Sequence, residues 1–388
     1  MAAAGLALVS AGCTGASGDD AALDDVVTFE TEPRYARADA APEGSWPAVV
    51  LHDETLFQRE PGALVVHGVA DGEETARFEP EGTPLFEPAD PTEQFQPAPA
   101  LADVDGDAVV LAGFAVEPAT GATQLDVEMV AVDAASGEER WRVTVPEPGG
   151  VGVVPQREAS VRVAGVDDGV AVVTVGHDGA TQVTFGLSLG DEPEVLWADD
   201  SLYASGVHDG VAVGFAEDED DVGELGLAAL DVATGDRVWG TFGDIERFVL
   251  AGPWVVATRD AESSDGGTGL VAVADGTEGE VDEGVLTADM ICEIDEAASV
   301  AVCAEDGTAA VAFDTENGDV LWSDDAWEGT LKGLWRGAAY VERGDAAVAL
   351  DARTGEVVVD DAGAAPAVVN DHVGVDQQGT DVVLYATR

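Results

Sequence analysis

Positive charge is scarce in this sequence. Its 388 residues include 16 lysines and arginines against 78 aspartates and glutamates, a formal net charge of −62, and Lys332 is the single lysine. Such a surface repels phosphate backbones and anionic lipid headgroups, and no basic cluster interrupts it. The composition argues against nucleic acid as a partner. It fits cationic partners, divalent ions or plain solubility, including solubility in a salty medium that screens the charge.

Helix signals and recognisable catalytic motifs are also scarce. Valine, threonine and glycine-punctuated alternation dominate, which predicts an all-β protein, and 46% apolar content supports a substantial core. The sequence has no Gly-x-Ser-x-Gly elbow, His-Glu-x-x-His helix or phosphate loop. We therefore expect no enzyme activity. The histidines are scattered in predicted tips and loops without metal-ligand spacing: His52, His67, His177, His208 and His372.

What the sequence does contain is a repeat. An apolar residue is followed by Asp, then three residues, Gly, an acidic residue and, eight places after the Asp, a large apolar side chain. A unit that recurs in this way must bury its apolar face against its neighbours. The four copies are Val132-Asp133…Gly137-Glu138…Trp141, Leu230-Asp231…Gly235-Asp236…Trp239, Phe313-Asp314…Gly318-Asp319…Trp322 and Leu350-Asp351…Gly355-Glu356…Val359.

Each copy predicts a β-hairpin with an aromatic anchor. The Asp carboxylate can accept backbone N–H groups two residues on, and the Gly can take the left-handed conformation that a short hairpin loop requires. A second hairpin precedes each copy, and the tips recur mostly at the interval of about 40 to 45 residues that is typical of a four-stranded propeller blade. These tips are predicted near Asp53, Gly106, Gly169, Gly210, Pro253, Ala297, Gly337 and His372.

The tryptophans give a second count of the blades. Trp239 and Trp322 are 83 residues apart, which is two periods, and a degenerate copy at Asp275…Gly279 fills the gap. Another degenerate copy ends at Trp197, and the first copy lies in Ala63–Phe78. Counted in this way, seven blades extend from about residue 45 to residue 362. A strand at 26–29 can complete an eighth with the C-terminal strands and close the ring. We predict an eight-bladed β-propeller of four-stranded antiparallel blades, a single domain over 26–388, with seven blades as the alternative.

The pattern Ala-x-Asp-x-x-x-Gly-x-x-x-Trp resembles the tryptophan-docking repeat of PQQ-like β-propellers. This family includes the quinoprotein alcohol dehydrogenases and the outer-membrane assembly scaffold lipoproteins, and the resemblance covers nearly the whole chain after its N-terminal segment. It implies the fold but not quinone binding. In the dehydrogenases a vicinal cysteine pair lies beside the cofactor and Ca²⁺ helps to hold it. This chain is shorter and has no adjacent cysteines, so we expect no PQQ.

The N-terminus resembles a bacterial lipoprotein signal. Residues 1–12 form an apolar run that ends in small residues before Cys13, the predicted lipidation site, and 13–25 read as a flexible linker. Two features depart from the pattern: Ser10 replaces the usual Leu, and no basic residue precedes the run, so the true start codon can lie upstream. The run is too short to span a bilayer as a helix. The alternative is a buried free cysteine in an N-terminal strand.

The other two cysteines predict a disulfide. Cys292 and Cys303 flank a hairpin tip symmetrically, which makes them cross-strand partners within reach of disulfide geometry. A disulfide is typical of an oxidising, extracytoplasmic compartment. Two buried thiols are the alternative.

Two acidic loops are weak cation candidates. Asp103, Asp105 and Asp107 offer the hard oxygen ligands that Ca²⁺ prefers, but the downstream ligands of a calcium loop are missing and a hairpin turn explains them as well. The run 217–221 reads as a solvated loop, with calcium or a cationic partner as the minority interpretation.

These observations predict a non-catalytic, lipid-anchored extracytoplasmic scaffold, monomeric, that binds envelope proteins through its propeller loops and contacts the membrane through its lipid alone. Two alternatives stay open: a redox enzyme that uses PQQ or another small ligand, and a sensor of small ligands or ions.

Overall fold

The protein's two compact units are described separately in a computed structural model. One unit is Asp39–Gly243, and the other is Asp244–Arg388 together with the N-terminal segment that ends at Ala38. The structure describes residues 23, 26–38, 47–60, 62–85, 97–104, 106–118, 125–148, 159–176, 182–190, 192–217, 225–241, 245–259, 267–279, 286–287 and 289–388.

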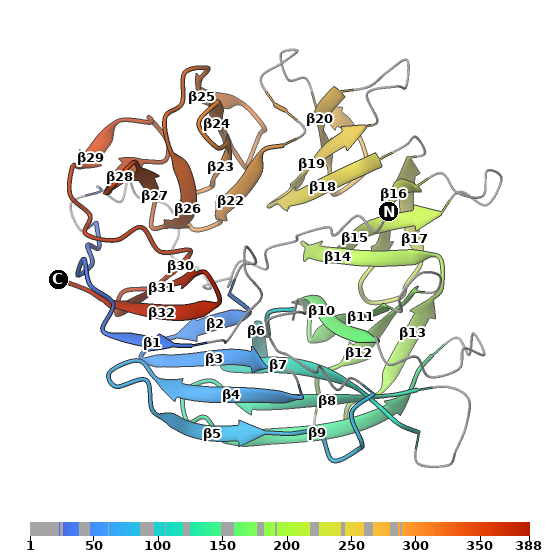
Figure 1. Ribbon diagram of the computed structural model, residues 1–388. Helices are drawn as coiled ribbons and strands as arrows, with labels where there is room; N and C mark the ends of the chain where they lie inside the picture. The colour runs from blue at the N-terminus through green and yellow to red at the C-terminus, as the bar shows by residue number, and fades with distance from the viewer. Residues whose placement is uncertain are drawn as a thin grey trace. The chain divides into compact units, whose positions relative to one another are not determined.

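The regular structure of the described residues is entirely β. Eight four-stranded antiparallel sheets follow one another along the chain (Figure 1), and they are the blades of an eight-bladed β-propeller. The predicted all-β class and the count of eight are confirmed, and the alternative of seven is wrong. No helix in the part of the chain described is long and apolar enough to cross a membrane.

The first unit contains four blades, each with its strands paired in chain order. They are β2 (Val49–His52), β3 (Thr55–Glu60), β4 (Ala63–Gly68) and β5 (Glu74–Phe78); β6 (Ala100–Val104), β7 (Asp107–Val116), β8 (Asp126–Asp133) and β9 (Glu139–Pro146); β10 (Ser160–Asp167), β11 (Val170–Gly176), β12 (Gln182–Ser188) and β13 (Val195–Asp199); and β14 (Leu202–His208), β15 (Val211–Glu217), β16 (Leu225–Asp231) and β17 (Arg237–Thr241).

The second unit contains the other four blades. They are β18 (Ile245–Ala251), β19 (Trp254–Arg259), β20 (Gly267–Ala272) and β21 (Glu278–Gly279); β22 (Ile291–Asp295), β23 (Val300–Glu305), β24 (Ala309–Asp314) and β25 (Val320–Asp324); β26 (Thr330–Trp335), β27 (Ala338–Arg343), β28 (Ala346–Asp351) and β29 (Val357–Val359); and β30 (Val368–Val369), β31 (Val373–Gln378), β32 (Asp381–Ala386) and β1 (Tyr35–Arg37).

The eighth blade joins the two ends of the chain. β1 pairs with β32, Tyr35 opposite Leu384, so an N-terminal strand completes the C-terminal sheet. The strand lies later than the sequence suggests, because Phe29 makes only a single bridge to Thr387 and donates its N–H to Ala362 O at 2.8 Å. Phe29 is fully buried, so the apolar run around it anchors the segment rather than extending the sheet.

The degenerate fifth repeat is displaced from its predicted position. Its turn is closed by the bond from Gly276 N–H to Ala272 O at 2.9 Å, which corresponds to the bond from Gly235 N–H to Asp231 O at 2.8 Å in the fourth blade. The copy therefore runs from Ala272, three residues before the predicted Asp275. Because Ala272 stands where the other copies have aspartate, the residue that marks the start of the repeat is missing from this copy.

The core lies between the faces of successive blades. Within the first unit, one cluster of buried side chains joins the second blade to the third and another joins the third to the fourth. Within the second unit, such clusters join the fifth blade to the sixth, the sixth to the seventh and the seventh to the eighth. The third, sixth and seventh blades therefore bury both faces of their sheets, which explains why their central strands are continuous apolar runs.

Candidate functional site

The repeated aspartate and glycine adopt one shared turn. Asp133 Oδ1 accepts the Ser136 N–H at 2.7 Å, and Gly137, at φ 70°, donates its N–H to Asp133 O at 2.8 Å. Hydrogen bonds from the Ser136 hydroxyl and backbone lower the pKa of Asp133. The same closing bond and left-handed glycine recur at Asp231–Gly235, Asp314–Gly318 and Asp351–Gly355.

The tryptophan of one blade docks on the turn glycine of the next. Trp197 on β13 donates its Nε1–H to Val232 O at 2.7 Å. A Cβ built on Gly235 would lie 2.7 Å from the indole ring, so only glycine leaves room for the contact. The turn therefore closes the hairpin and also forms the surface on which the indole of the preceding blade packs.

Of the other repeat tryptophans, Trp322 makes the same contact. Trp322 on β25 donates to Ala352 O at 2.8 Å and lies 3.0 Å from a Cβ built on Gly355. Trp141 packs, partly exposed, on the cluster between the second and third blades, and Trp239 is 9% exposed.

Trp254 supplies an indole that the sequence analysis missed. It begins β19 in the fifth blade, whose copy of the repeat has no tryptophan, and its ring lies 3.0 Å from a Cβ built on Gly318 in the sixth blade. Its Nε1 is buried and has no hydrogen-bond partner in the part of the chain that the structure describes. Its position could have been noticed in the sequence, because Trp254 follows the predicted tip at Pro253, one blade before the complete motif Asp314…Gly318.

The outer strands carry a second repeated feature, a β-bulge directly before the tryptophan position. In the third blade Leu187 pairs with Val195 and Gly186 with Trp197, which leaves Leu196 as the extra residue. Three bulged residues are large, apolar and 41–45% exposed: Leu196, Val238 and Val358. The full set is Thr75, Arg140, Leu196, Val238, Leu321 and Val358.

Two arginines, Arg59 and Arg162, connect neighbouring blades in the first unit. Arg59 on β3 donates to Gly113 O on β7 at 3.0 Å and lies 3.9 Å over the Phe114 ring. Burial lowers the pKa of Arg59 to about 9. Arg162 on β10 donates to Ser205 O on β14 at 2.7 Å. These cations bond to backbone carbonyls, so their roles here are structural.

The single lysine lies between the seventh and eighth blades. Lys332 is the bulged residue of β26, and its Nζ is 3.0 Å from Asp376 Oδ1 on β31. Burial raises the pKa of Asp376 against the opposing attraction of Lys332. The pair is only 18% and 6% exposed, which places the chain's one ammonium group in an interior ion pair.

Glu293 is a buried acid that forms no ion pair with any of the described residues. It stands two residues before the end of β22, the place that Gly165, Gly206 and Gly333 fill in β10, β14 and β26. Its Oε1 has no hydrogen-bond partner, and burial raises the pKa of Glu293 well above its ordinary value.

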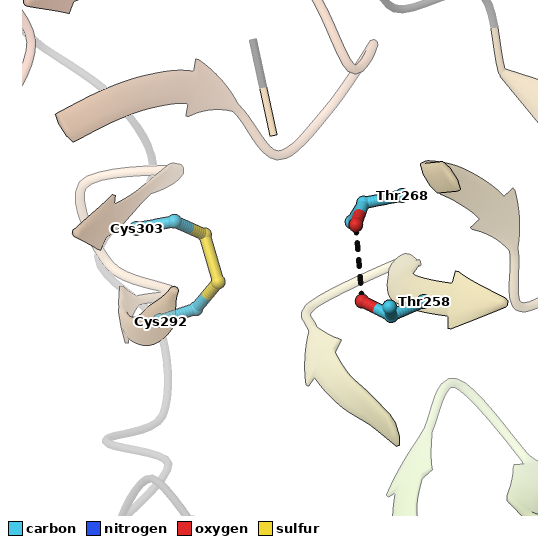
Figure 2. The surroundings of a disulfide bond; sticks show 4 residues. All are labelled: Thr258, Thr268, Cys292 and Cys303. Atoms are coloured by element: carbon cyan, nitrogen blue, oxygen red, sulfur yellow. Dashed lines mark hydrogen bonds between the residues drawn. A yellow bond between two sulfur atoms is a disulfide. The ribbon is translucent and has the colours of Figure 1, made fainter. Parts of the chain in front are cut away.

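The structure contains the predicted disulfide. Cys292 on β22 and Cys303 on β23 are register partners, joined by a disulfide, with Cα atoms 3.9 Å apart. Figure 2 shows the bridge projecting toward Thr258 and Thr268 of the fifth blade, whose hydroxyls are 3.1 Å apart. The disulfide thus lies within the cluster of buried side chains that joins the fifth and sixth blades.

The candidate calcium ligands make other contacts. Asp103 Oδ1 accepts the Gly106 N–H at 2.9 Å, and Asp107 forms an ion pair with Arg140 at 3.3 Å. Asp105, most of the 217–221 run and Cys13 lie outside the described residues. Within the described ranges, no group of three or more His, Cys, Asp or Glu side chains is arranged to hold a metal ion.

A known family of repeat proteins matches part of this chain. Residues 65–241 match a family model of PQQ-like repeats described as "Outer membrane protein assembly factor BamB". This match supports a PQQ-like repeat β-propeller. No curated protein sequence matches it.

Solved structures share the propeller fold at low identity. BamB from Moraxella catarrhalis is 12% identical, with a TM-score of 0.50, over 93% of this chain and 100% of that one. The quinohemoprotein alcohol dehydrogenase ADHIIG of Pseudomonas putida HK5 is 10% identical, with a TM-score of 0.55, over 92% and 76%. The quinohemoprotein alcohol dehydrogenase of Comamonas testosteroni is 11% identical, with a TM-score of 0.52, over 93% and 76%.

The residues of this PQQ-like propeller do not match the quinone site that the resemblance implies. That site has a vicinal cysteine pair, whereas Cys292 and Cys303 are eleven residues apart and are joined across two strands within one blade.

Proposed function

We propose that this propeller is a non-catalytic, protein-binding scaffold of the cell envelope, held at the membrane by a lipid on Cys13. The observation that carries the proposal is the match of residues 65–241 to a family described as an outer-membrane protein assembly factor. Propellers offer many loops on a rigid frame, a suitable arrangement for binding other proteins. The disulfide supports an oxidising compartment outside the cytoplasm.

Native envelopes offer a direct test of binding. Affinity-tagged protein, cross-linked in native envelopes and purified, is expected to recover the same protein partner in replicate experiments. A matched control is the tagged protein with Gly235→Val, which disturbs blade docking. Repeated recovery of no partner by the wild type contradicts the scaffold.

The lipid anchor is tested separately. The full-length protein is expected to incorporate labelled palmitate and to fractionate with membranes, and Cys13→Ala is expected to release it. The double variant Cys292→Ser and Cys303→Ser is the control, because it removes the other cysteines but keeps the lipidation site. Membrane association that survives Cys13→Ala contradicts the anchor.

The fold of the quinohemoprotein dehydrogenases keeps a redox enzyme as the second candidate. Incubation with PQQ and Ca²⁺, followed by gel filtration, separates the two functions. The scaffold predicts no co-eluting chromophore and no alcohol-dependent dye reduction. Stoichiometric absorbance with turnover establishes the enzyme instead.

A further inference from the structure

The N-terminal segment is fastened to one end of the seventh blade. Leu23 packs on the cluster between the seventh and eighth blades, and its Cδ2 lies 3.7 Å from a Cβ built on Gly337, in the hairpin tip between β26 and β27. Four residues later, Val27 O accepts a hydrogen bond from the Tyr340 hydroxyl at 3.0 Å. The described part of the segment before β1 (blue in Figure 1) therefore meets the propeller at this tip.

The seventh blade has two distinct ends. One, which we call the tip end, carries the β26–β27 tip and the turn 351–355. Arg353 in that turn donates to Ala298 O at 3.1 Å, and Ala298 also lies 3.7 Å from the Cβ built on Gly337. The other, the loop end, carries the connection 344–345 between β27 and β28. A strand of six residues, such as β28, separates the two ends by about 20 Å.

The predicted lipidation site is close to Leu23 along the chain. Cys13 precedes Leu23 by ten residues, which include glycine, serine and alanine. Ten residues span at most about 36 Å when fully extended. A Gly- and Ser-rich chain of that length has a root-mean-square span of only about 17 Å. Because this is less than the length of the blade, a lipid on Cys13 favours orientations in which the tip end is nearer to the bilayer.

The side chains at the tip end are compatible with a lipid surface, although the chain as a whole is acidic. Arg336 and Arg353 are 59% and 43% exposed. Trp335 is partly exposed, and the Arg336 guanidinium lies 5.8 Å from its ring. Tryptophan is common at the headgroup level of membranes, and arginine keeps its charged head in water while its stem covers apolar surface.

We propose that the tip end of the seventh blade faces the bilayer and that its loop end faces away, where other envelope proteins reach it. The short connection from Cys13 to Leu23 sets this orientation. This inference rests on the proposed lipid anchor, and it adds which surface of the propeller faces the membrane.

Energy transfer to the membrane tests the orientation. Thr354→Cys in the turn and Ala346→Cys at the start of β28 place one new thiol at each end of the same blade, and both positions are exposed. The full-length lipidated variants carry a donor fluorophore on this thiol and are bound to phosphatidylcholine vesicles with acceptor-labelled headgroups. The Thr354→Cys label is expected to transfer energy at least about twofold more efficiently, because the other label lies about 20 Å farther from the bilayer. Equal transfer, or stronger transfer from the Ala346→Cys label, overturns the proposal.

The length of the linker tests the cause. Twenty glycine and serine residues inserted after Ser17 raise the root-mean-square span to about 30 Å, which exceeds the length of the blade. The difference between the two labels is then expected to disappear. Ala16→Gly with Ser17→Gly is the matched control, because it changes the composition of the linker but keeps its length, and it should preserve the difference. A difference that persists with the longer linker overturns the tether as its cause.

Flotation of the vesicles separates this inference from the anchor on which it rests. Flotation that survives Cys13→Ala contradicts the lipid anchor, and the orientation with it. Flotation that requires Cys13, combined with equal transfer from the two labels, overturns the orientation and leaves the anchor in place.

Discussion

Two blade junctions, one in each unit, achieve the same contact from different sequences. Between the third and fourth blades, the outer-strand Trp197 docks on Gly235 and bonds Val232 O. Between the fifth and sixth blades, Trp254 approaches Gly318 from the second strand, and its Nε1 has no partner. The comparison teaches that an indole can pack on a left-handed turn glycine from either the outer strand or the second strand of the preceding blade.

Removing either indole should be the most damaging change. Trp197→Ala and Trp254→Ala each leave a large cavity, so each is expected to cost about 3–5 kcal/mol of unfolding free energy. Urea denaturation followed by circular dichroism measures the loss. Leu196→Ala, at a 44% exposed neighbouring position, is the control and should change stability by less than about 0.5 kcal/mol. A negligible effect of Trp254→Ala shows that the two junctions are not equivalent.

The glycines test the other side of the contact. Gly235→Ala combines a positive φ of 74° with a Cβ 2.7 Å from the Trp197 ring, and we expect a loss of about 3 kcal/mol. Gly106→Ala has a positive φ of 89° but nothing within 4 Å, so strain alone should cost about 1 kcal/mol. Equal losses mean that backbone strain, and not docking, requires the glycine.

The indole nitrogen distinguishes the two junctions. Trp197→Phe leaves Val232 O without its donor and should cost about 1–2 kcal/mol beyond the change in volume. Trp254→Phe removes a buried N–H that has no partner, so that additional loss should be absent. The difference between the urea midpoints of the two variants measures the bond. If Trp254→Phe loses as much, the Trp254 nitrogen has an acceptor.

Two acids of the sixth blade should respond to pH with opposite signs. Glu293 has a raised pKa because of burial, so its contribution is favourable below about pH 4 and is lost as the pH rises through its folded value. Glu293→Gln should therefore stabilise the protein at pH 7 and not at pH 4. Urea midpoints at the two pH values check this, and equal effects at both contradict it.

Asp314 gives the opposite case. Burial opposes ionisation, but hydrogen bonds from Arg353 and Glu316 N–H lower the pKa of Asp314. Its contribution is present above about pH 4 and is lost as the pH falls through its folded value. Asp314→Asn should destabilise the protein at pH 7, with a difference that shrinks at acid pH. A constant difference across that range indicates that lost hydrogen bonds alone account for it.

Most of the fold could be predicted from the repeat. The eight predicted tips fall at the ends of the first strands, because each depends on local turn chemistry around residues such as Asp168-Gly169 and Asp209-Gly210, which have positive φ. Errors arose where that chemistry was weak. Alanine at 272 concealed the fifth turn, and the apolar run at 26–29 imitated a strand although β1 lies at Tyr35–Arg37.

The sequence alone determined the blade count, the turn glycines and the cross-strand cysteines, because spacing and turn chemistry act between near neighbours along the chain. Only the tertiary structure decided which side chains meet across blades. Trp254 against Gly318, the pairing of Lys332 with Asp376 and the burial of Glu293 all depend on how one sheet packs on the next. No interval in the sequence encodes that packing, since it depends on the shapes of two faces at once.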